Sequence, residues 1–195
     1  LQVPETNAGS LLIIGASGGV GSIMIQLAKR LTDLTVIATA SRPETRTWAK
    51  ELGADHVIDH CQSLVDGLKA ADLPAVDYVA SLTHTDEHLA AIAELIAPQG
   101  RLAVIDDPAS FDIMPFKRKS VSVHWEFMFT RSLFQTADMI EQHRLLERVA
   151  QMVDGGELVT TLADEFGTIN AENLLRAHAL LESGKGRGKI VLRGF

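Results

Sequence analysis

The stretch Leu11-Leu12-Ile13-Ile14-Gly15-Ala16-Ser17-Gly18-Gly19-Val20-Gly21 decides the fold. Its apolar first part predicts a buried strand, and the glycines that follow predict a tight turn. After the turn, Ile23, Leu27 and Leu31 recur at the spacing of one helix face, so a helix follows. Strand, glycine turn and helix in this order are typical of a unit that binds the diphosphate of a dinucleotide.

Each glycine of the turn has a physical role in that interpretation. Gly18 lets the backbone approach a diphosphate, Gly21 lets helix and strand pack closely, and the free N–H groups at the helix start attract the anion. The candidate ligands in the turn are Ser17, Gly18, Gly19, Val20 and Gly21. The alternative is a glycine-rich turn that holds no ligand, because such a motif alone is weak evidence.

Strands and helices continue to alternate after the turn. Apolar runs predict strands at 34–40, 56–58, 76–82 and 101–105. Pro43 and Gly53 mark the ends of one predicted helix, and Pro98 ends another. This alternation predicts an α/β fold, a doubly wound parallel sheet of the Rossmann type.

From Ser120 to Phe129 apolar and polar residues alternate strictly, which predicts a strand at a sheet edge with one exposed face. A helix of about 16 residues then ends at Gly155-Gly156. A strand at 158–162, a helix that Asn170 caps and a strand at 189–192 complete the chain.

We expect one dinucleotide-binding domain over residues 1–195, with its core at 10–155 and a strand-and-helix extension at 156–195. The formal charge of -7 argues against binding to nucleic acid. No apolar run approaches the roughly 20 residues that a membrane helix needs, so no membrane association is expected. The single Cys61 cannot form an internal disulfide, which suits a reducing compartment, the cytoplasm.

The glycine turn reads A-x-G-x-x-G from Ala16 to Gly21, and with other motifs it resembles the quinone-oxidoreductase branch of the medium-chain dehydrogenase/reductase family. The other motifs are Leu52-Gly53-Ala54-Asp55-His56-Val57-Ile58, Pro98-Gln99-Gly100-Arg101-Leu102, Ala179-Leu180-Leu181-Glu182-Ser183-Gly184 and Gly188-Lys189-Ile190-Val191-Leu192. The likeness is strongest to the group often labelled zinc-type alcohol dehydrogenase-like, which generally lacks the zinc ligands.

The resemblance implies a zinc-independent enzyme that transfers a hydride from NADPH to a small quinone or another conjugated carbonyl. It implies that this chain, which begins at Leu1 rather than Met, lacks the domain that holds most of the substrate. The extension 156–195 would then pack towards that missing domain. We recognise no catalytic residue in the chain, and we expect the fragment alone to be inactive. Family members often pair through an edge strand like 120–129, which suggests a homodimer.

The end of the second predicted strand indicates NADP(H) rather than NAD(H). An acidic residue usually accepts the ribose hydroxyls of NAD at this place, whereas here Thr39, Ser41 and Arg42 occupy it. A hydroxyl and a guanidinium suit a 2′-phosphate. Arg42 could also be a solvated loop residue. By the resemblance, His60 contacts the adenosine end, although it could equally be a surface histidine.

Other candidates follow from the rule that ligands lie beyond the carboxyl ends of the strands. By the resemblance, Ser81, Leu82, Thr83, Ile105 and Asp106 line the diphosphate and the nicotinamide. Phe127 could border the nicotinamide, although its spacing, like that of Phe129, favours a place in the core. Lys189 could contact a cofactor phosphate, whereas the run 185–189 is more typical of a solvated turn.

Two competing signals carry less weight. The turn also resembles that of short-chain dehydrogenases, but four residues after Tyr78, the single tyrosine, stands Leu82 instead of the lysine those enzymes need. The stretch His84–His88 matches the zinc-peptidase pattern H-x-x-E-H. We interpret it as a helix start capped by Thr83, and we expect no metal site. Two further alternatives stay open: a zinc-dependent alcohol dehydrogenase and a non-enzymatic NADPH sensor.

Overall fold

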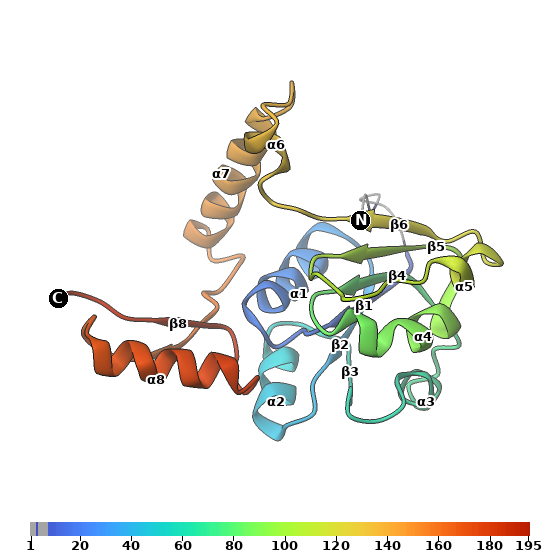
Figure 1. The fold of residues 1–195 in the computed structure, drawn as a ribbon, viewed down its shortest axis with the longest axis horizontal. Coiled ribbons are helices and arrows are strands. Elements are labelled where there is room, and N and C mark those ends of the chain that lie inside the picture. Colours follow the sequence, from blue (N-terminus) through green and yellow to red (C-terminus); the bar gives the residue numbers. More distant parts are fainter. Residues whose placement is uncertain (1–2, 4–7) are drawn as a thin grey trace.

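A computed structural model describes residues 3 and 8–195 of the chain. Six parallel strands form one sheet in the order β3-β2-β1-β4-β5-β6 (Figure 1). The strands are β1 (Ser10–Ile14), β2 (Thr35–Thr39), β3 (His56–Ile58), β4 (Val76–Ser81), β5 (Ile96–Val104) and β6 (Ser122–Trp125). The order reverses direction between β1 and β4, as in a doubly wound sheet, so the predicted fold class is confirmed.

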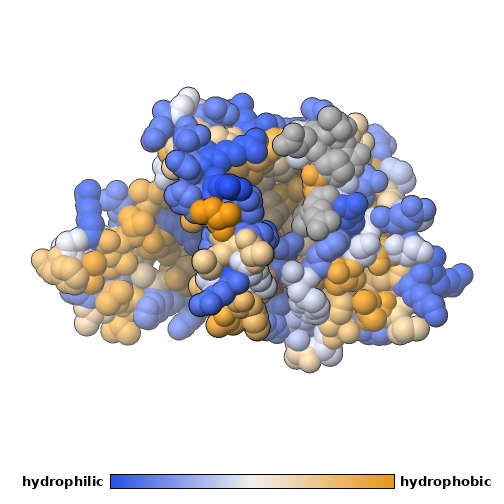
Figure 2. Space-filling model, turned by 90° about the horizontal axis from the view of Figure 1, so that it is seen from above, coloured by the Kyte–Doolittle hydropathy of each residue, from blue (hydrophilic) through white to orange (hydrophobic). Residues whose placement is uncertain are grey.

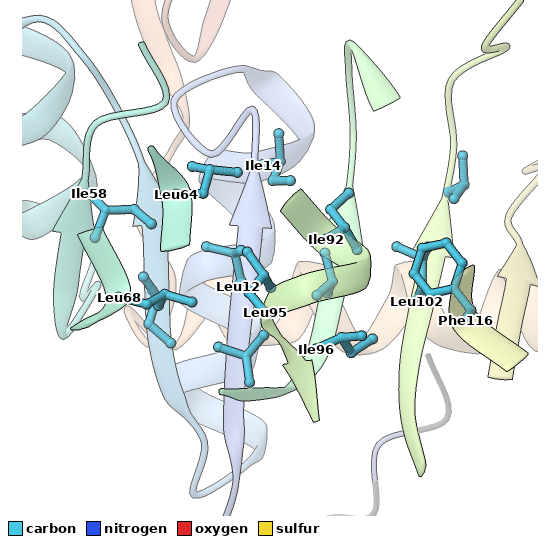
Figure 3. Close-up of a cluster of buried hydrophobic side chains, with 14 residues drawn as sticks. Leu12, Ile14, Ile58, Leu64, Leu68, Ile92, Leu95, Ile96, Leu102 and Phe116 are labelled. Carbon is cyan, nitrogen blue, oxygen red and sulfur yellow. The ribbon is translucent and has the colours of Figure 1, made fainter. Parts of the chain in front are cut away.

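Helices cover both faces of this sheet. Those that connect the strands are α1 (Gly19–Leu31), α2 (Pro43–Glu51), α3 (Leu64–Ala70), α4 (Thr85–Leu95) and α5 (Met114–Lys117). Successive β1 residues point to opposite faces: Leu12 and Ile14 pack with α3 and α4, whereas Leu11 and Ile13 pack with α1 and α2. Figure 3 shows the first of these two clusters, in which Phe116 of α5 is also buried.

The short helix α3 has no counterpart among the predicted elements. Its seven residues include Gly67, so the segment is too short to show a helical period. Ser63 caps it by accepting a hydrogen bond from the Asp66 N–H at 3.1 Å. Buried Leu64 and Leu68 fix the helix on the sheet, so packing rather than local pattern defines it.

The remaining elements extend from the sheet. They are α6 (Thr130–Leu133), α7 (Ile140–Asp154), β7 (Leu162–Glu165), α8 (Ala171–Glu182) and β8 (Lys189–Val191). α7 projects away from the body in Figure 1, and β7 and β8 form a separate two-stranded parallel sheet beside α8. Asn170 caps α8 by accepting a hydrogen bond from the Asn173 N–H at 2.8 Å, as predicted. None of the helices that the structure describes is both long and apolar enough to cross a membrane.

The predicted edge strand 120–129 is too long. β6 pairs with β5 only as far as the partners Val104 and Trp125, because β5 ends there. Beyond that point the backbone turns into α6, so Phe127 and Phe129 are not strand residues. Their exposed fractions are 58% and 52%, and the prediction that they belong to the core is therefore wrong.

The predicted strand at 158–162 is displaced, because β7 begins only at Leu162. Both backbone groups of Val159 are already bonded to the Gln26 side chain, its N–H to Oε1 at 2.8 Å and its carbonyl to Nε2 at 3.1 Å. Gln26 belongs to α1, so a helix side chain takes the place of a neighbouring strand. The neighbouring Leu158 is buried, so the apolar pattern of this stretch reflects packing on the body.

Candidate functional site

The glycine turn joins β1 to α1 at the carboxyl edge of the sheet. Gly15 has φ +80°, a left-handed conformation that favours glycine, and its N–H donates to Thr39 Oγ1 at 3.1 Å. Thr39 is buried, and its hydroxyl supports the turn by accepting this hydrogen bond. The turn is therefore fixed by the end of β2.

Two glycines in the turn are required for different reasons. A Cβ on Gly21 would lie 2.5 Å from the Ala16 backbone, so only glycine lets α1 pack against the turn. A Cβ on Gly18 would meet only the Gly15 carbonyl oxygen, at 3.5 Å, so the space beside Gly18 is open to a ligand. These are the two roles that the sequence predicted for them.

The first turn of α1 offers its backbone amides to an anion. No acidic side chain lies in that turn, and no side chain caps the helix at Gly18. The turn is braced from outside, where the Ser22 hydroxyl donates to the Ser17 carbonyl at 3.3 Å and accepts from Trp48 Nε1 at 2.8 Å. The Ser22 contacts therefore fix the turn, while the first-turn N–H groups of α1 remain available to a ligand.

A cavity of about 550 Å³ lies over this helix start. Eight of the predicted site residues line it: Ser17, Gly18, Gly19, Val20, Gly21, His60, Leu82 and Thr83. Eight lining residues were not among the predicted site residues: Ile14, Gly15, Cys61, His84, Glu87, His88, Gly184 and Gly186. The cavity thus combines the glycine turn, the ends of β3 and β4, and a distant C-terminal segment.

Three histidines, His60, His84 and His88, line this cavity. His60 Nδ1 is buried and has no hydrogen-bond partner among the described residues. His84 has a left-handed backbone, φ +52°, and its Nδ1 lies 2.7 Å from Thr83 Oγ1. Burial lowers the pKa of His88, and the His60 and His84 rings lower it further against the effect of Glu87. These surroundings therefore favour the neutral form of His88.

The stretch His84–His88 is a helix start, as the sequence interpretation held, but its cap was wrongly assigned to Thr83. The Thr85 N–H donates instead to Asp106 Oδ2 at 3.0 Å, and the Thr85 hydroxyl bonds both Asp106 Oδ1 and Ser81 Oγ. Ser81 and Asp106, two predicted cofactor contacts, thus stabilise the turn between β4 and α4. Among the residues that the structure describes, no group of three His, Cys, Asp or Glu side chains could hold a metal ion.

Arg42 lies at the start of α2, outside the lining of the cavity. Its Nε is 3.0 Å from Glu44 Oε1, and its Nη2 donates to the Lys185 carbonyl at 2.6 Å. Ser41, half-buried, precedes it. Phe127 and Ile105 lie beyond the ends of β6 and β5, both exposed. The structure thus brings the diphosphate candidates together, whereas these residues stay apart from them.

Lys189 reaches the glycine turn from the other end of the chain. A Cβ on Gly19 would lie 2.9 Å from its Nζ, so the lysine side chain covers the first turn of α1. The backbone follows the same path, because the Gly188 N–H donates to the Ser17 carbonyl at 2.8 Å. Residues 185–187 form an irregular connection and β8 begins at Lys189, so the predicted turn is not found; Lys185 and Lys189 are exposed, and residues 186–188 are half-buried.

Comparison with known proteins shows the family to which this chain belongs. Residues 52–192 match the zinc-binding dehydrogenase family. The chain belongs to this family, part of the medium-chain dehydrogenase/reductase superfamily, and corresponds to its nucleotide-binding domain.

Two relatives are similar over nearly the whole chain. A zinc-type alcohol dehydrogenase-like protein of Staphylococcus aureus (strain MRSA252) is 41% identical over 191 residues, which are 97% of this chain and 57% of that protein. A Rhizobium etli CFN 42 protein, provisionally described as a zinc-dependent alcohol dehydrogenase, has a crystal structure 59% identical in sequence with a TM-score of 0.91. The alignment covers 99% of this chain and 56% of that one. The chain thus spans little more than half the length of either relative.

More distant structures share the fold. A mycobacterial protein, Rv1454c, complexed with NADPH has a TM-score of 0.76 at 23% identity, over 96% of this chain and 57% of that one. An NAD-dependent alcohol dehydrogenase has a TM-score of 0.79 at 21% identity, over 98% of this chain and 52% of that one. The fold alone is therefore compatible with either cofactor.

Proposed function

We propose that this chain is the NADP(H)-binding part of an oxidoreductase that transfers a hydride from NADPH to a quinone or another conjugated carbonyl without zinc. The observation that carries the proposal is the cavity of about 550 Å³ at the start of α1, with unblocked amides on one side and open space beside Gly18. When bound, the reduced nicotinamide supplies the hydride. The chain's own residues bind and orient the cofactor.

The residues around the cavity fit a dinucleotide. Gly18 leaves room for a diphosphate at the helix start, and Lys189 places a positive charge over the same turn. Leu82 and Thr83 at the end of β4 border the cavity where a bound nicotinamide would pass. His60, with its unpartnered buried nitrogen, provides a hydrogen-bonding group on the adenosine side.

Preference for NADP(H) follows from the β2–α2 turn. No carboxylate ends β2, and Arg42 is positioned there by the Lys185 carbonyl. Its partner Glu44 is 54% exposed, so a 2′-phosphate can displace that ion pair at small cost. Thr39 supports the glycine turn through Gly15, and Ser41 is a candidate for a second hydrogen bond to the phosphate.

A homodimer through β6 is part of this proposal. β6 is the outermost strand on its side of the sheet, so its outer backbone groups have no neighbouring strand in the sheet. Trp125 at its end is 62% exposed, and Phe127 and Phe129 follow it at the surface. Pairing of two such edges would extend the sheet and cover these apolar side chains.

The experiment that tests this function measures NADPH oxidation with a panel of quinones and enones in protein that carries this chain. Turnover that persists after removal of metal by a chelator, in zinc-free protein checked by mass spectrometry, supports the proposal. Tight NADPH binding without any turnover would support the sensor alternative instead.

The second candidate is a zinc-dependent alcohol dehydrogenase, and the descriptions of the two similar relatives favour it. In that case the metal ligands lie in a part of the protein beyond this chain. Loss of activity on chelation, with recovery on addition of zinc, would establish this candidate and overturn zinc independence.

A further inference from the structure

The segment Gly184–Lys189 connects α8 to β8. It lies beside both the glycine turn and the β2–α2 turn, the two parts of the proposed cofactor site. Gly18 and Gly188 form an isolated parallel bridge, and Gly184 and Gly186 line the cavity. A Cβ on Gly188 would lie 3.1 Å from the Trp48 ring, so the segment also passes close to α2. Residues more than 140 positions from the β2–α2 turn are thus brought beside it, as the bond between Arg42 and Lys185 shows.

Arg187 lies at the centre of this segment. Its guanidinium is 5.3 Å from the centre of the Trp48 ring, a cation–π contact, and the Trp48 indole is itself fixed by Ser22. The Arg187 side chain forms no ion pair within the described part of the chain. A half-buried, oriented and unpaired guanidinium therefore stands two residues from the carbonyl that Arg42 binds.

A cation in addition to Arg42 would favour phosphate binding at the β2–α2 turn, where Arg46 also lies but donates to the Ala40 and Val57 carbonyls at 3.1 and 3.0 Å. Arg42 is paired with Glu44 at 3.0 Å, so these two side chains together carry no net charge. A 2′-phosphate carries between one and two negative charges at neutral pH. Two guanidinium groups bind a phosphate through more charge-assisted hydrogen bonds than one, and Arg187 offers the second without an ion-pair partner in the described part of the chain.

We infer that Arg187 is a second specificity-determining residue for the 2′-phosphate of NADP(H), acting together with Arg42 from the opposite side of the α2 start. This inference rests on the proposed preference for NADP(H). The Gly184–Lys189 segment then forms a wall of the cofactor site, with Lys189 facing the diphosphate and Arg187 facing the 2′-phosphate.

Calorimetric titration of NADP⁺ and NAD⁺ into Arg187→Met tests the inference, because methionine keeps an apolar side chain over Trp48 and removes the charge. We expect the Kd for NADP⁺ to rise roughly tenfold and the Kd for NAD⁺ to stay within about twofold. Arg187→Lys should lose less than Arg187→Met. Arg176→Met is the matched control, because Arg176 covers the Phe166 ring at 4.9 Å in the same C-terminal unit and should change neither constant.

The outcomes separate this inference from the proposed function. If the unaltered protein binds NAD⁺ as tightly as NADP⁺, the proposed cofactor preference is wrong and the inference falls with it. If the unaltered protein prefers NADP⁺ and Arg42→Ala removes that preference while Arg187→Met does not, the inference alone is overturned. Equal losses for both nucleotides, with a lower melting temperature, would assign Arg187 a purely structural role and also overturn it.

Discussion

At the scale of single residues, the glycine turn is where sequence and structure agree most closely. Sequence assigned Gly21 to helix packing, which the space around it confirms, and Gly18 to ligand approach, for which the space beside it is open. Thr39, Ser81 and Asp106, which sequence placed among the cofactor contacts, also bond other parts of the protein. A hydroxyl or carboxylate near a strand end has the same pattern in a sequence whether it faces a ligand or a neighbouring backbone.

The two glycines predict opposite behaviour on substitution. Gly21→Ala would push a Cβ into the Ala16 backbone, and we expect a loss of about 2 kcal/mol in the free energy of unfolding. Gly18→Ala should leave stability nearly unchanged, since its Cβ has room, and should weaken dinucleotide binding by obstructing the diphosphate. Denaturant unfolding and calorimetry on both variants check this pair. Equal stability of the two variants would contradict the packing role of Gly21.

Asp55 makes stability depend on pH. Burial raises its pKa, but hydrogen bonds from Lys29 and the Val36 N–H and the charge of Lys29 outweigh this, so the pKa lies below its ordinary value of 3.8. The ionised carboxylate therefore stabilises the folded chain above pH 3.8, and this contribution is lost as the pH falls through the lower folded-state pKa.

Asp55→Asn should be less stable than the unaltered chain at pH 7 by about 0.5 kcal/mol, because the pair with Lys29 is partly exposed. The difference should shrink as the pH is lowered towards 3. Thermal unfolding of both proteins across this range measures it. A difference that stays constant with pH would show that the charge of Asp55 contributes nothing.

At the scale of elements, the sequence predicted the six strands of the sheet because apolar runs and glycine or proline boundaries coincide there. It missed α3, which is too short to show a helical period. It placed a strand at 158–162, where the Gln26 side chain bonds the Val159 backbone, whereas β7 begins only at Leu162. It extended β6 past Trp125 because alternation in a sequence does not reveal where the partner strand ends. These errors share one cause: contacts between segments distant in the chain decided the outcome.

The start of α4 provides a test at this scale. Asp106 accepts hydrogen bonds from the N–H and hydroxyl of Thr85, so a residue after β5 caps a helix after β4. Asp106→Ala should lower the free energy of unfolding by about 1–2 kcal/mol through loss of the cap. Asp107→Ala, at the exposed neighbouring position, is the control and should lie within about 0.5 kcal/mol of the unaltered chain. Similar losses in both variants would refute the cap.

At the scale of the whole molecule, the C-terminal unit is joined to the sheet by a few contacts that the sequence did not indicate. Gln26, Ser17 and Arg42 each bond a residue of the segment 156–189. Sequence indicated the basic run 185–189, with Arg187 and Lys189, as a possible phosphate contact, but no local pattern relates that run to α2. Apolar side chains also reach the surface in the view down onto the α7 end of the molecule (Figure 2).

The proposed dimer predicts a measurable mass. In light scattering the protein should have twice the mass of its polypeptide, and Trp125→Asp should shift it towards the monomer, because a buried unpaired charge opposes association. Phe195→Asp is the control: Phe195 is fully exposed at the other end of the chain and should leave the dimer intact. A monomeric unaltered protein at micromolar concentration would count against pairing through β6.

The proposed function depends most directly on whether the start of α1 binds a dinucleotide. Calorimetric titration of the folded protein with NADP⁺ and with NAD⁺, at one salt concentration, is the most direct measurement. We predict one bound nucleotide per chain, a lower Kd for NADP⁺ than for NAD⁺, and loss of both signals in Gly18→Ala. Absence of heat from either nucleotide at millimolar concentration, in protein whose fold is verified, would contradict the central claim.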